Sequence, residues 1–456
     1  MIILKGKVVK VTTKLLEKFG YKQELKRSLS FGDLVIYGLI FMVPIAPFGI
    51  YGEVIIEAHG MVALAYLIGM IGMIFTALSY ARMSEAFPMA GSVYSYAGRG
   101  INQYVGFIAG WAILLDYILV PALLYVVSAT ALTGMWPTIP GWIWLIVFIV
   151  INTVINYFGI EFTARTNKIF LIFELLVLVI FLVVGITAIV KGVNGAEFSF
   201  DPLYNPDTFS MSVVMGAVSI AVLSFLGFDA ISTLSEESAG GPKAIGKATI
   251  FSLLIVGVLF MVQTWVAALI FPDYHAFKDV GTAFYETATI AGGEWLGILT
   301  AVATALAWGI ADALVAQVAI SRVLFSMGRD RKLPHFLAKV HPKYKTPYAS
   351  ILVIAVISFI VGLIFMGSIG ILTSFINFGA LTAFLFLHVS VFVHYFLRKK
   401  SGNVWSHIIL PAIGFIIIAY VWINLATQAK VLGISWMLVG IAVAIYFAMK
   451  KKDVSI

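Results

Sequence analysis

The sequence predicts an all-α membrane protein with twelve transmembrane helices, and three observations predict it. First, 61% of the 456 residues are apolar and only 11% are charged, whereas a soluble globular protein carries about a quarter charged residues. Second, the apolar residues gather into runs long enough to cross a bilayer. Third, Lys and Arg are shared unequally between the two sets of loops that join those runs. Ordinary soluble proteins are therefore excluded, because too little polar surface remains to cover a body of this size.

Apolar runs of about 20 residues, the length that a helix needs to cross the hydrocarbon core, occur twelve times in the chain. They cover residues 32–57, 61–82, 104–132, 139–158, 167–190, 211–235, 249–271, 295–326, 347–366, 369–396, 405–424 and 431–449. Residues 1–30 and 450–456 flank the runs, and we expect them to be cytoplasmic segments.

The charges in the loops predict the orientation. With a cytoplasmic N-terminus, 27 of the 30 Lys and Arg residues fall in cytoplasmic segments, and only Lys191, Lys278 and Lys430 fall outside. Cytoplasmic loops carry such an excess of Lys and Arg. If one of the middle runs did not cross the membrane, every later loop would change sides and the excess would be lost. We therefore expect a multi-pass protein of the plasma membrane with both termini cytoplasmic. The formal charge of +8 reports this topology and requires no nucleic-acid partner.

Several kinds of catalytic and energy-coupling site lack their residues in this sequence. The chain has no Cys and only seven scattered His, so thiolate chemistry and a clustered metal site are not expected. No HExxH motif, DxD motif or phosphate-binding P-loop occurs. We expect neither an enzyme nor an ATP-driven pump, and no metal or organic cofactor. A polytopic membrane transferase is a less favoured alternative.

Two of the twelve runs contain residues that interrupt a helix. The first run contains Pro44–Gly52 (PIAPFGIYG), and the sixth contains Ser224–Asp229 (SFLGFD). Taken singly, a proline kink and a packing glycine explain them well. Interruptions five spans apart, however, indicate an inverted repeat, and paired interruptions are the best sequence pointer to a transporter's central site. The exposed helix ends would offer N–H groups to a carboxylate and carbonyls to an ammonium group or a cation.

Further stretches of the sequence resemble a known family. They are Phe87–Tyr96 (FPMAGSVYSY), Gly110-Trp111 with Leu115-Asp116-Tyr117, Phe225–Glu237 (FLGFDAISTLSEE) and Ser321–Pro334 (SRVLFSMGRDRKLP). Over nearly its whole length the chain is similar to the amino acid–polyamine–organocation (APC) transporter family, and within it to the putrescine-importer-like branch.

The resemblance implies a transporter core of two inverted five-helix repeats with discontinuous helices 1 and 6. The repeats would be residues 31–190 and 211–396, followed by two additional C-terminal helices in 405–449. It also implies a substrate site between helices 1, 3, 6, 8 and 10, and secondary-active transport of an amino acid or a small amine.

The resemblance also suggests which residues contact the substrate. Helix 1 would offer backbone groups of Ile45, Ala46, Phe48 and Gly49. Its proline-containing sequence differs, however, from the glycine-rich run that many members of the family carry at this position. The other candidates are Asp116, Tyr117, Phe225, Gly227, Phe228, Asp229 and Trp308. The aromatic members would cover the substrate and make cation–π contacts with its ammonium group. For Asp229 a cap at the helix break is favoured over substrate contact. For Asp116 a brace between helices and substrate contact are both open.

Two further intramembrane acids suggest how transport is coupled to an ion. Glu174 lies about 10 Å and Asp312 roughly 15 Å from the cytoplasmic end of its helix, at 1.5 Å per residue. Some relatives carry a lysine where this chain has Glu174, so the charge there is reversed. Two carboxyl groups at similar depth cannot both ionise cheaply, so a proton or a cation would sit between them. We expect H⁺ as the coupling ion, with Na⁺ as the second possibility.

The sequence thus predicts a proton-coupled importer that works by alternating access on an amino acid or a small amine such as a polyamine. A transporter-like nutrient sensor or a channel is the alternative. The exact substrate, the ion stoichiometry and the oligomeric state stay open.

Overall fold

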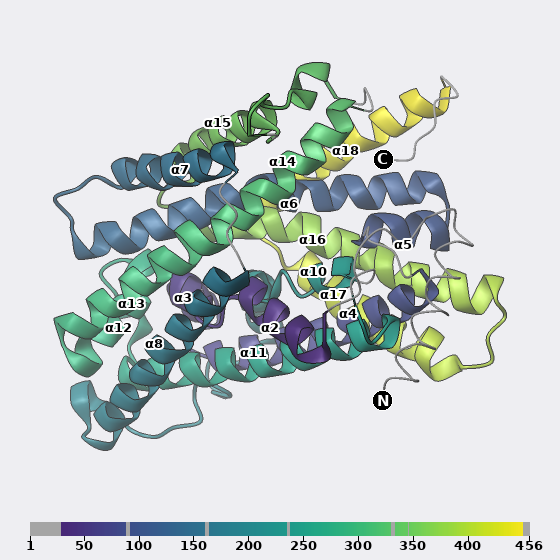
Figure 1. Cartoon of the computed structure of the whole chain (residues 1–456). Helices are drawn as coiled ribbons and strands as arrows, with labels where there is room; N and C mark the ends of the chain where they lie inside the picture. The colour runs from purple at the N-terminus through teal and green to yellow at the C-terminus, as the bar shows by residue number, and fades with distance from the viewer. Residues whose placement is uncertain are drawn as a thin grey trace.

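The computed structural model describes residues 29–87, 92–159, 164–234, 238–329, 333–344 and 346–449. In these ranges the fold is a bundle of helices without a β-strand, and its one isolated bridge joins Leu29 to Ser238 (Figure 1). Eleven described helices are long and apolar enough to cross a membrane, and the bent pair α2–α3 raises the number to twelve. The all-α membrane fold is confirmed. The expected cytoplasmic segments, apart from Leu29 and Ser30, lie outside the described residues.

The spans follow one another in chain order. They are α2 (Phe31–Met42) with α3 (Pro47–Glu57), α4 (Val62–Ala86), α6 (Gln103–Met135), α7 (Gly141–Phe158), α8 (Ala164–Val190), α9 (Met211–Ala221) with η2 (Val222–Phe225) and α10 (Ala230–Thr233), α11 (Pro242–Ile270), α13 (Glu294–Leu306) with η6 (Ala307–Asp312) and α14 (Ala313–Arg329), α15 (Tyr348–Phe365), α16 (Ile369–Val391) with η8 (Phe392–Arg398), η9 (Trp405–Ile409) with α17 (Leu410–Ile423), and α18 (Thr427–Met449). Shorter helices, α5 (Ser92–Gly100) and α12 (Ala283–Gly292), lie between spans.

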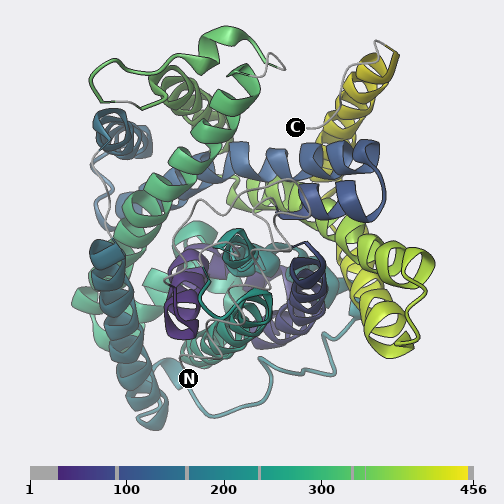
Figure 2. The ribbon, with the colours of Figure 1, turned by 45° about the vertical axis from the view of Figure 1, so that its right-hand side comes forward.

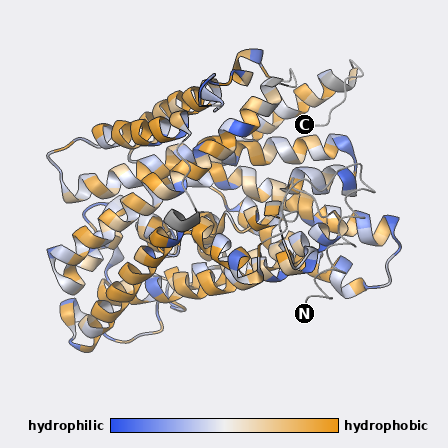
Figure 3. Ribbon diagram, in the orientation of Figure 1, coloured by the Kyte–Doolittle hydropathy of each residue, from blue (hydrophilic) through white to orange (hydrophobic). Residues whose placement is uncertain are grey.

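Burial separates the central spans from the lipid-facing ones. In α6, 83% of the most apolar window is buried inside the protein, against 28% in α7 and 22% in α18. A helix that is apolar on every side is stable only where protein or lipid surrounds it, and Figure 3 shows such apolar residues along nearly all the spans. Helix α6 therefore belongs to the core of the bundle, and α7 and α18 to its rim.

Several spans that lie five apart in sequence order pack against each other. Helix α4 contacts α11, α6 contacts α13 and α14, and α7 contacts α15. Figure 2 shows α2, α4 and α11 grouped together, with α6 crossing beside them. In the inverted repeat that the sequence predicts, spans five apart are the corresponding ones, and the repeat itself stays a prediction.

The first span breaks between α2 and α3, which are bent by 60° relative to each other. Val43 has a φ of 44°, a value that a β-branched residue rarely adopts. It precedes Pro44, whose ring disfavours the helical conformation in the residue before it. Pro47 then begins α3, where a missing N–H costs nothing. The break is therefore shorter than the interruption read from the sequence, and Phe48 and Gly49 lie in regular helix.

The sixth span loses its helix between Ala221 and Ala230. After the 3₁₀ turn η2, Leu226 is extended and Gly227 has a φ of 104°, which favours glycine. A Cβ on Gly227 would lie 2.9 Å from the carbonyl oxygen of Phe41, near the end of α2. The two breaks therefore face each other closely, and Gly227 is required both for its backbone angle and for this approach.

The eighth span contains a π-helical segment, η6, which the sequence did not predict. π-Helical segments are rare and occur often at functional sites. In this span the wider turn carries Trp308 at its start and Asp312 at its end.

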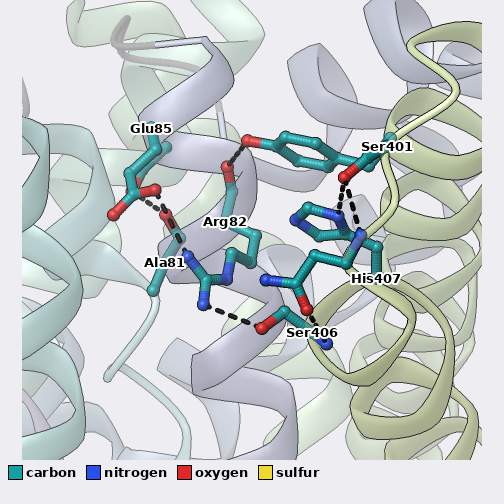
Figure 4. Close-up of polar contacts among 9 residues, drawn as sticks. Ala81, Arg82, Glu85, Ser401, Ser406 and His407 are labelled. Carbon is teal, nitrogen blue, oxygen red and sulfur yellow. Dashed lines mark hydrogen bonds and ion pairs between the residues drawn. The ribbon is translucent and has the colours of Figure 1, made fainter.

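At one end of the bundle, α4 is tied to η9. Arg82 forms an ion pair with Glu85 at 3.5 Å and donates a hydrogen bond to Ser406 Oγ at 3.2 Å (Figure 4). His407 Nδ1 lies 2.8 Å from Ser401 Oγ beside them. We call this end of the bundle, where α2 begins and α18 ends, the basic face, and the opposite end the distal face.

Candidate functional site

A cavity of about 130 Å³ lies where the two breaks meet the third and eighth spans. Its lining residues come from α2, α6, α14, η6 and the two breaks. They are Phe41, Met42, Val43, Ala46, Asp116, Tyr117, Val120, Leu123, Leu124, Leu223, Ser224, Leu226, Gly227, Asp229, Ala230, Trp308, Asp312, Val315, Ala316 and Ala319. We call it the central cavity.

Three carboxylic acids line this otherwise apolar cavity. Asp116 comes from α6, Asp229 from the break before α10, and Asp312 from the end of η6. Asp116 and Asp229 are 6% and 7% exposed and close enough to repel each other electrostatically. Tyr80 Oη donates a long hydrogen bond of 3.5 Å to Asp229 Oδ2. Among the described lining residues there is no Lys, Arg or His, so the cavity favours a positively charged ligand.

Two aromatic side chains line the same cavity. Tyr117 follows Asp116 on α6, and Trp308 lies at the start of η6. Trp308 is 3% exposed, and its Nε1 has no hydrogen-bond partner among the described residues. An aromatic face within about 6 Å of a cation attracts it. Together with Ala46, Asp116, Gly227, Asp229 and Asp312, these are the sequence-predicted residues that the structure brings together.

The other candidates from helix 1 lie outside the lining of the central cavity. Ile45 is fully buried, and the Phe48 ring stacks on Phe284 with 3.9 Å between ring centroids. A Cβ on Gly49 would lie 2.5 Å from Val127 Cγ1, so this residue serves close helix packing. Substrate contact by Ile45, Phe48 and Gly49 stays a prediction that this packing does not favour.

The two phenylalanines of the sixth span also face away from the cavity lining. The Phe225 ring packs against Tyr66 and Phe260, at centroid distances of 6.2 and 5.2 Å. Phe228 packs against Tyr80 and Phe384 at 5.6 and 5.7 Å. Both are fully buried. They hold the ends of the second break in place, and the substrate contact expected from the resemblance stays a prediction for both.

The first break has few N–H groups to offer a ligand. The amides of Ala46, Phe48 and Gly49 already donate to the carbonyls of Val43, Ile45 and Ala46, at 2.7, 3.0 and 3.2 Å. Pro44 and Pro47 have no N–H at all. A substrate carboxylate therefore finds few free donors at this break.

A second, much smaller cavity of about 10 Å³ lies between the first, fifth and eighth spans. Glu174 of α8 and Asp312 both line it, and the two carboxyl groups interact electrostatically. Glu174 is 4% exposed, and its Oε2 has no hydrogen-bond partner among the described residues. Asp312 lines this cavity and the central one alike. Asp312 is therefore the acid that the two cavities share.

Sequence reasoning missed the apolar wall of the central cavity. Val120, Leu123 and Leu124 follow Asp116 at helical spacing on α6. Val315, Ala316 and Ala319 follow Asp312 in the same way on α14. The spacing i, i+4, i+7 from each predicted acid is the signal that identifies such a face.

A large vestibule of about 830 Å³ opens at the distal face. Its charged lining residues are acidic except for Lys278. The acids are Glu53, Asp279, Glu286 and Glu294. Positive solutes are therefore concentrated at this mouth.

Twelve apolar spans around a small cavity, with broken helices at its wall, define a membrane transporter. Residues 28–449 match the family model described as amino acid permease. The chain therefore belongs to the amino acid permease family of APC transporters, as the sequence motifs indicated.

Three relatives match this chain over more than nine tenths of their length, and each is named as an importer, a permease or a transporter. The low-affinity putrescine importer PlaP of Escherichia coli (strain K12) is 31% identical over 439 residues, covering 94% of this chain and 95% of that protein. The branched-chain amino acid permease BcaP of Lactococcus lactis subsp. cremoris (strain MG1363) is 30% identical over 451 residues, covering 91% and 93%. The methylthioribose transporter of Bacillus subtilis (strain 168) is 26% identical over 456 residues, covering 94% and 95%. The chain is thus a secondary transporter and not an enzyme, as predicted.

Proposed function

We propose that this transporter imports a small organic cation of the diamine class, such as putrescine, in symport with protons. One observation carries the proposal: the central cavity is lined by Asp116, Asp229 and Asp312 and by no described basic residue. Buried carboxylates need a positive partner to stay ionised in a low-dielectric site. A relative named as a putrescine importer supports this substrate class.

An apolar amino acid is the second candidate. The apolar wall of Val120, Leu123 and Leu124 favours it, and so does a relative named as a branched-chain amino acid permease. An amino acid would also need donors for its carboxylate. The scarcity of free N–H groups at the first break counts against it.

The position of Asp312 suggests how the ion and the substrate are coupled. Two carboxylates facing one small cavity repel each other strongly, so a proton on Glu174 lowers the cost of an ionised Asp312. The substrate ammonium then compensates the charge of Asp312 from the central cavity. Closing the protein over an uncompensated buried carboxylate is costly, so the form that closes is the one carrying both proton and substrate. Na⁺ in the small cavity is the alternative coupling ion.

Alternating access requires a seal on each side of the central cavity. Toward the distal face, Phe48 of α3 stacks on Phe284 of α12, and Tyr51 meets the same ring edge-on at 5.5 Å. On the first span, Phe48 and Tyr51 lie between Ala46, which lines the central cavity, and Glu53, which lines the acidic vestibule. We infer that this aromatic group separates the two cavities. We assign the basic face to the cytoplasm of a plasma-membrane protein because of the positive-inside rule. The substrate then enters from the vestibule and passes this seal.

Counterflow in proteoliposomes tests the proposal. Vesicles preloaded with unlabelled putrescine, arginine, leucine or alanine are diluted into the same labelled compound. Uptake of putrescine with little uptake of leucine and alanine is expected. Uptake of leucine without uptake of putrescine would contradict the diamine proposal and support an apolar amino acid as the substrate. Flux that does not depend on exchange would support a channel. An imposed proton gradient, compared with a sodium gradient, then identifies the coupling ion.

A further inference from the structure

Three buried carboxamide side chains touch the three interrupted spans. Gln263 of α11 donates from Nε2 to the carbonyl of Pro44 in the first break, at 3.0 Å. Asn377 of α16 donates from Nδ2 to the carbonyl of Ser219 in the last turn of α9, at 2.8 Å. Asn152 of α7 donates to the carbonyl of Gly309 in η6, at 2.7 Å. All three residues are fully buried.

The carbonyls that receive these bonds are those that an interrupted helix leaves without a backbone donor. The last four carbonyls of a helix lack an intrahelical partner, and a buried, unpaired carbonyl is costly in a bilayer. Ser219 lies in such a last turn, and Pro44 lies between two helices. Gly309 lies within a π-helical segment.

The carboxamides of Gln263 and Asn152 are each held in one orientation by a second carbonyl. Gln263 also donates to Leu259 O at 2.9 Å, and Asn152 also donates to Phe148 O at 2.8 Å. Both of these partners lie one turn earlier on the side chain's own helix. Because both neighbours of the amide are acceptors, only the NH₂ group can face them. The amide oxygens of all three residues have no hydrogen-bond partner among the described residues.

The three carboxamides lie behind the wall of the central cavity, not in it. Pro44 adjoins the lining residue Val43, and Gly309 adjoins the lining residue Trp308. Ser219 lies one helical turn before the lining residue Leu223. None of the carboxamides is itself a lining residue. Any effect of these side chains on the substrate must therefore pass through the backbone that they hold.

We propose that Gln263, Asn377 and Asn152 are positioning residues that clamp the three interrupted spans in the geometry that forms the substrate cavity. The NH₂ group is the functional part of each side chain. A residue of the same size without a donor would release the carbonyl and with it the adjacent part of the cavity wall. The clamps act on the cavity backbone whatever substrate the transporter carries, so they do not depend on the diamine proposal.

The test at the first break compares two substitutions of equal size. Gln263→Met removes both donors, and Gln263→Glu restores one donor when its carboxyl group is protonated. We expect Gln263→Met to raise the KM for counterflow about tenfold, the loss of roughly one hydrogen bond to a buried carbonyl. We expect Gln263→Glu to recover most of that loss at acid pH, measured at equal pH on both sides of the vesicle. Equal behaviour of the two variants at every pH, or a wild-type KM in Gln263→Met, would overturn the clamp at this break.

A second pair of variants separates the clamp from ordinary packing. Asn152→Leu removes the bond to Gly309, whereas Asn156→Leu, one turn further along α7, removes bonds to the Gln317 side chain and to Leu314 O in regular helix. Hydrogen–deuterium exchange in detergent reads the backbone directly and needs no substrate. We expect faster exchange in peptides covering 305–313 for Asn152→Leu only. The same increase in both variants, or in neither, would contradict the proposal.

The probes for the kinetic arm are labelled putrescine and labelled leucine. If wild-type protein exchanges leucine and not putrescine, the diamine proposal fails while the kinetic test of the clamp proceeds with leucine. If it exchanges neither, hydrogen–deuterium exchange still decides the clamp. Melting temperatures of all variants show whether each one folds.

Discussion

Glu174 and Asp312 line one small cavity between the fifth and eighth spans, and Asp312 also lines the central cavity. The two residues lie more than a hundred positions apart in sequence, and packing of α8 against η6 brings them together. Asp312 is thereby placed to respond both to an ion at Glu174 and to a substrate. This shared residue is the structural basis of the proposed coupling.

Neutralising Glu174 should uncouple transport from the proton gradient. We expect Glu174→Gln to reduce gradient-driven accumulation of putrescine at least tenfold, because a carboxamide cannot take up and release a proton. Counterflow, which needs no gradient, should stay within about threefold of wild type because the side chain is nearly isosteric. Glu197→Gln, at an exposed acid between α8 and α9 that lines neither the vestibule nor the central cavity, is the control. Full accumulation by Glu174→Gln would refute the coupling role.

Removing the charge of Asp116 should weaken binding of a cationic substrate. A hydrogen bond to a charged group contributes about 1.5–3 kcal/mol, so we expect Asp116→Asn to raise the KM for putrescine roughly 10- to 100-fold. Asp207→Asn changes an exposed loop acid and should leave the KM unchanged. Competition with unlabelled putrescine in counterflow measures both. An unaltered KM in Asp116→Asn would give this residue a structural role instead.

The Trp308 ring should contribute through its aromatic face. We expect Trp308→Phe to keep most of the affinity for putrescine and Trp308→Leu to lose about 3- to 30-fold, the range of a partly desolvated cation–π contact. Trp295→Leu, at a ring that is 53% exposed, serves as the control. Equal losses in Trp308→Phe and Trp308→Leu would argue for shape or the indole N–H instead of the ring face.

Close helix packing at Gly379 should limit stability. A Cβ at this position of α16 would lie 2.6 Å from the carbonyl oxygen of Ala112 on α6. Because backbone atoms cannot move aside cheaply, we expect Gly379→Ala to cost about 1–3 kcal/mol and to lower the melting temperature. Gly402→Ala adds a methyl group where no atom lies within 4 Å and should change little. A thermal-shift assay on both variants checks this, and an unchanged melting temperature in Gly379→Ala would show that α6 and α16 move apart.

Sequence reasoning placed the acids better than the aromatic residues. Asp116 and Asp229 were expected at the substrate site and line the central cavity, because a buried carboxyl group almost always faces a cavity or a partner. Asp312, which was expected only at an ion-coupling site with Glu174, lines the central cavity too. Phe48, Phe225 and Phe228 do not line it. An aromatic side chain is equally stable in a cavity wall and in the packed core, so its residue type does not predict whether it faces a cavity.

The interrupted spans show the same division. The prolines at positions 44 and 47 marked the first break, and Gly227 marked the second, because each has a direct backbone consequence. The π-helical turn around Gly309 had no marker of this kind. It depends on contacts with α7, where Asn152 supplies the donor that the turn requires.

The sequence by itself determined the class of the molecule: a polytopic helical membrane protein with twelve spans and interruptions in two of them. Those properties depend on neighbouring residues alone, because the length of an apolar run, the charge of a loop and the position of a proline do not depend on which distant residues come into contact. Only the tertiary structure decided that Asp312 lines two cavities, that Phe48 stacks on Phe284, and that three carboxamides donate to carbonyls of the interrupted spans. Such relationships depend on which faces of distant helices meet, and helices that are apolar on every side carry no periodic pattern to specify those faces.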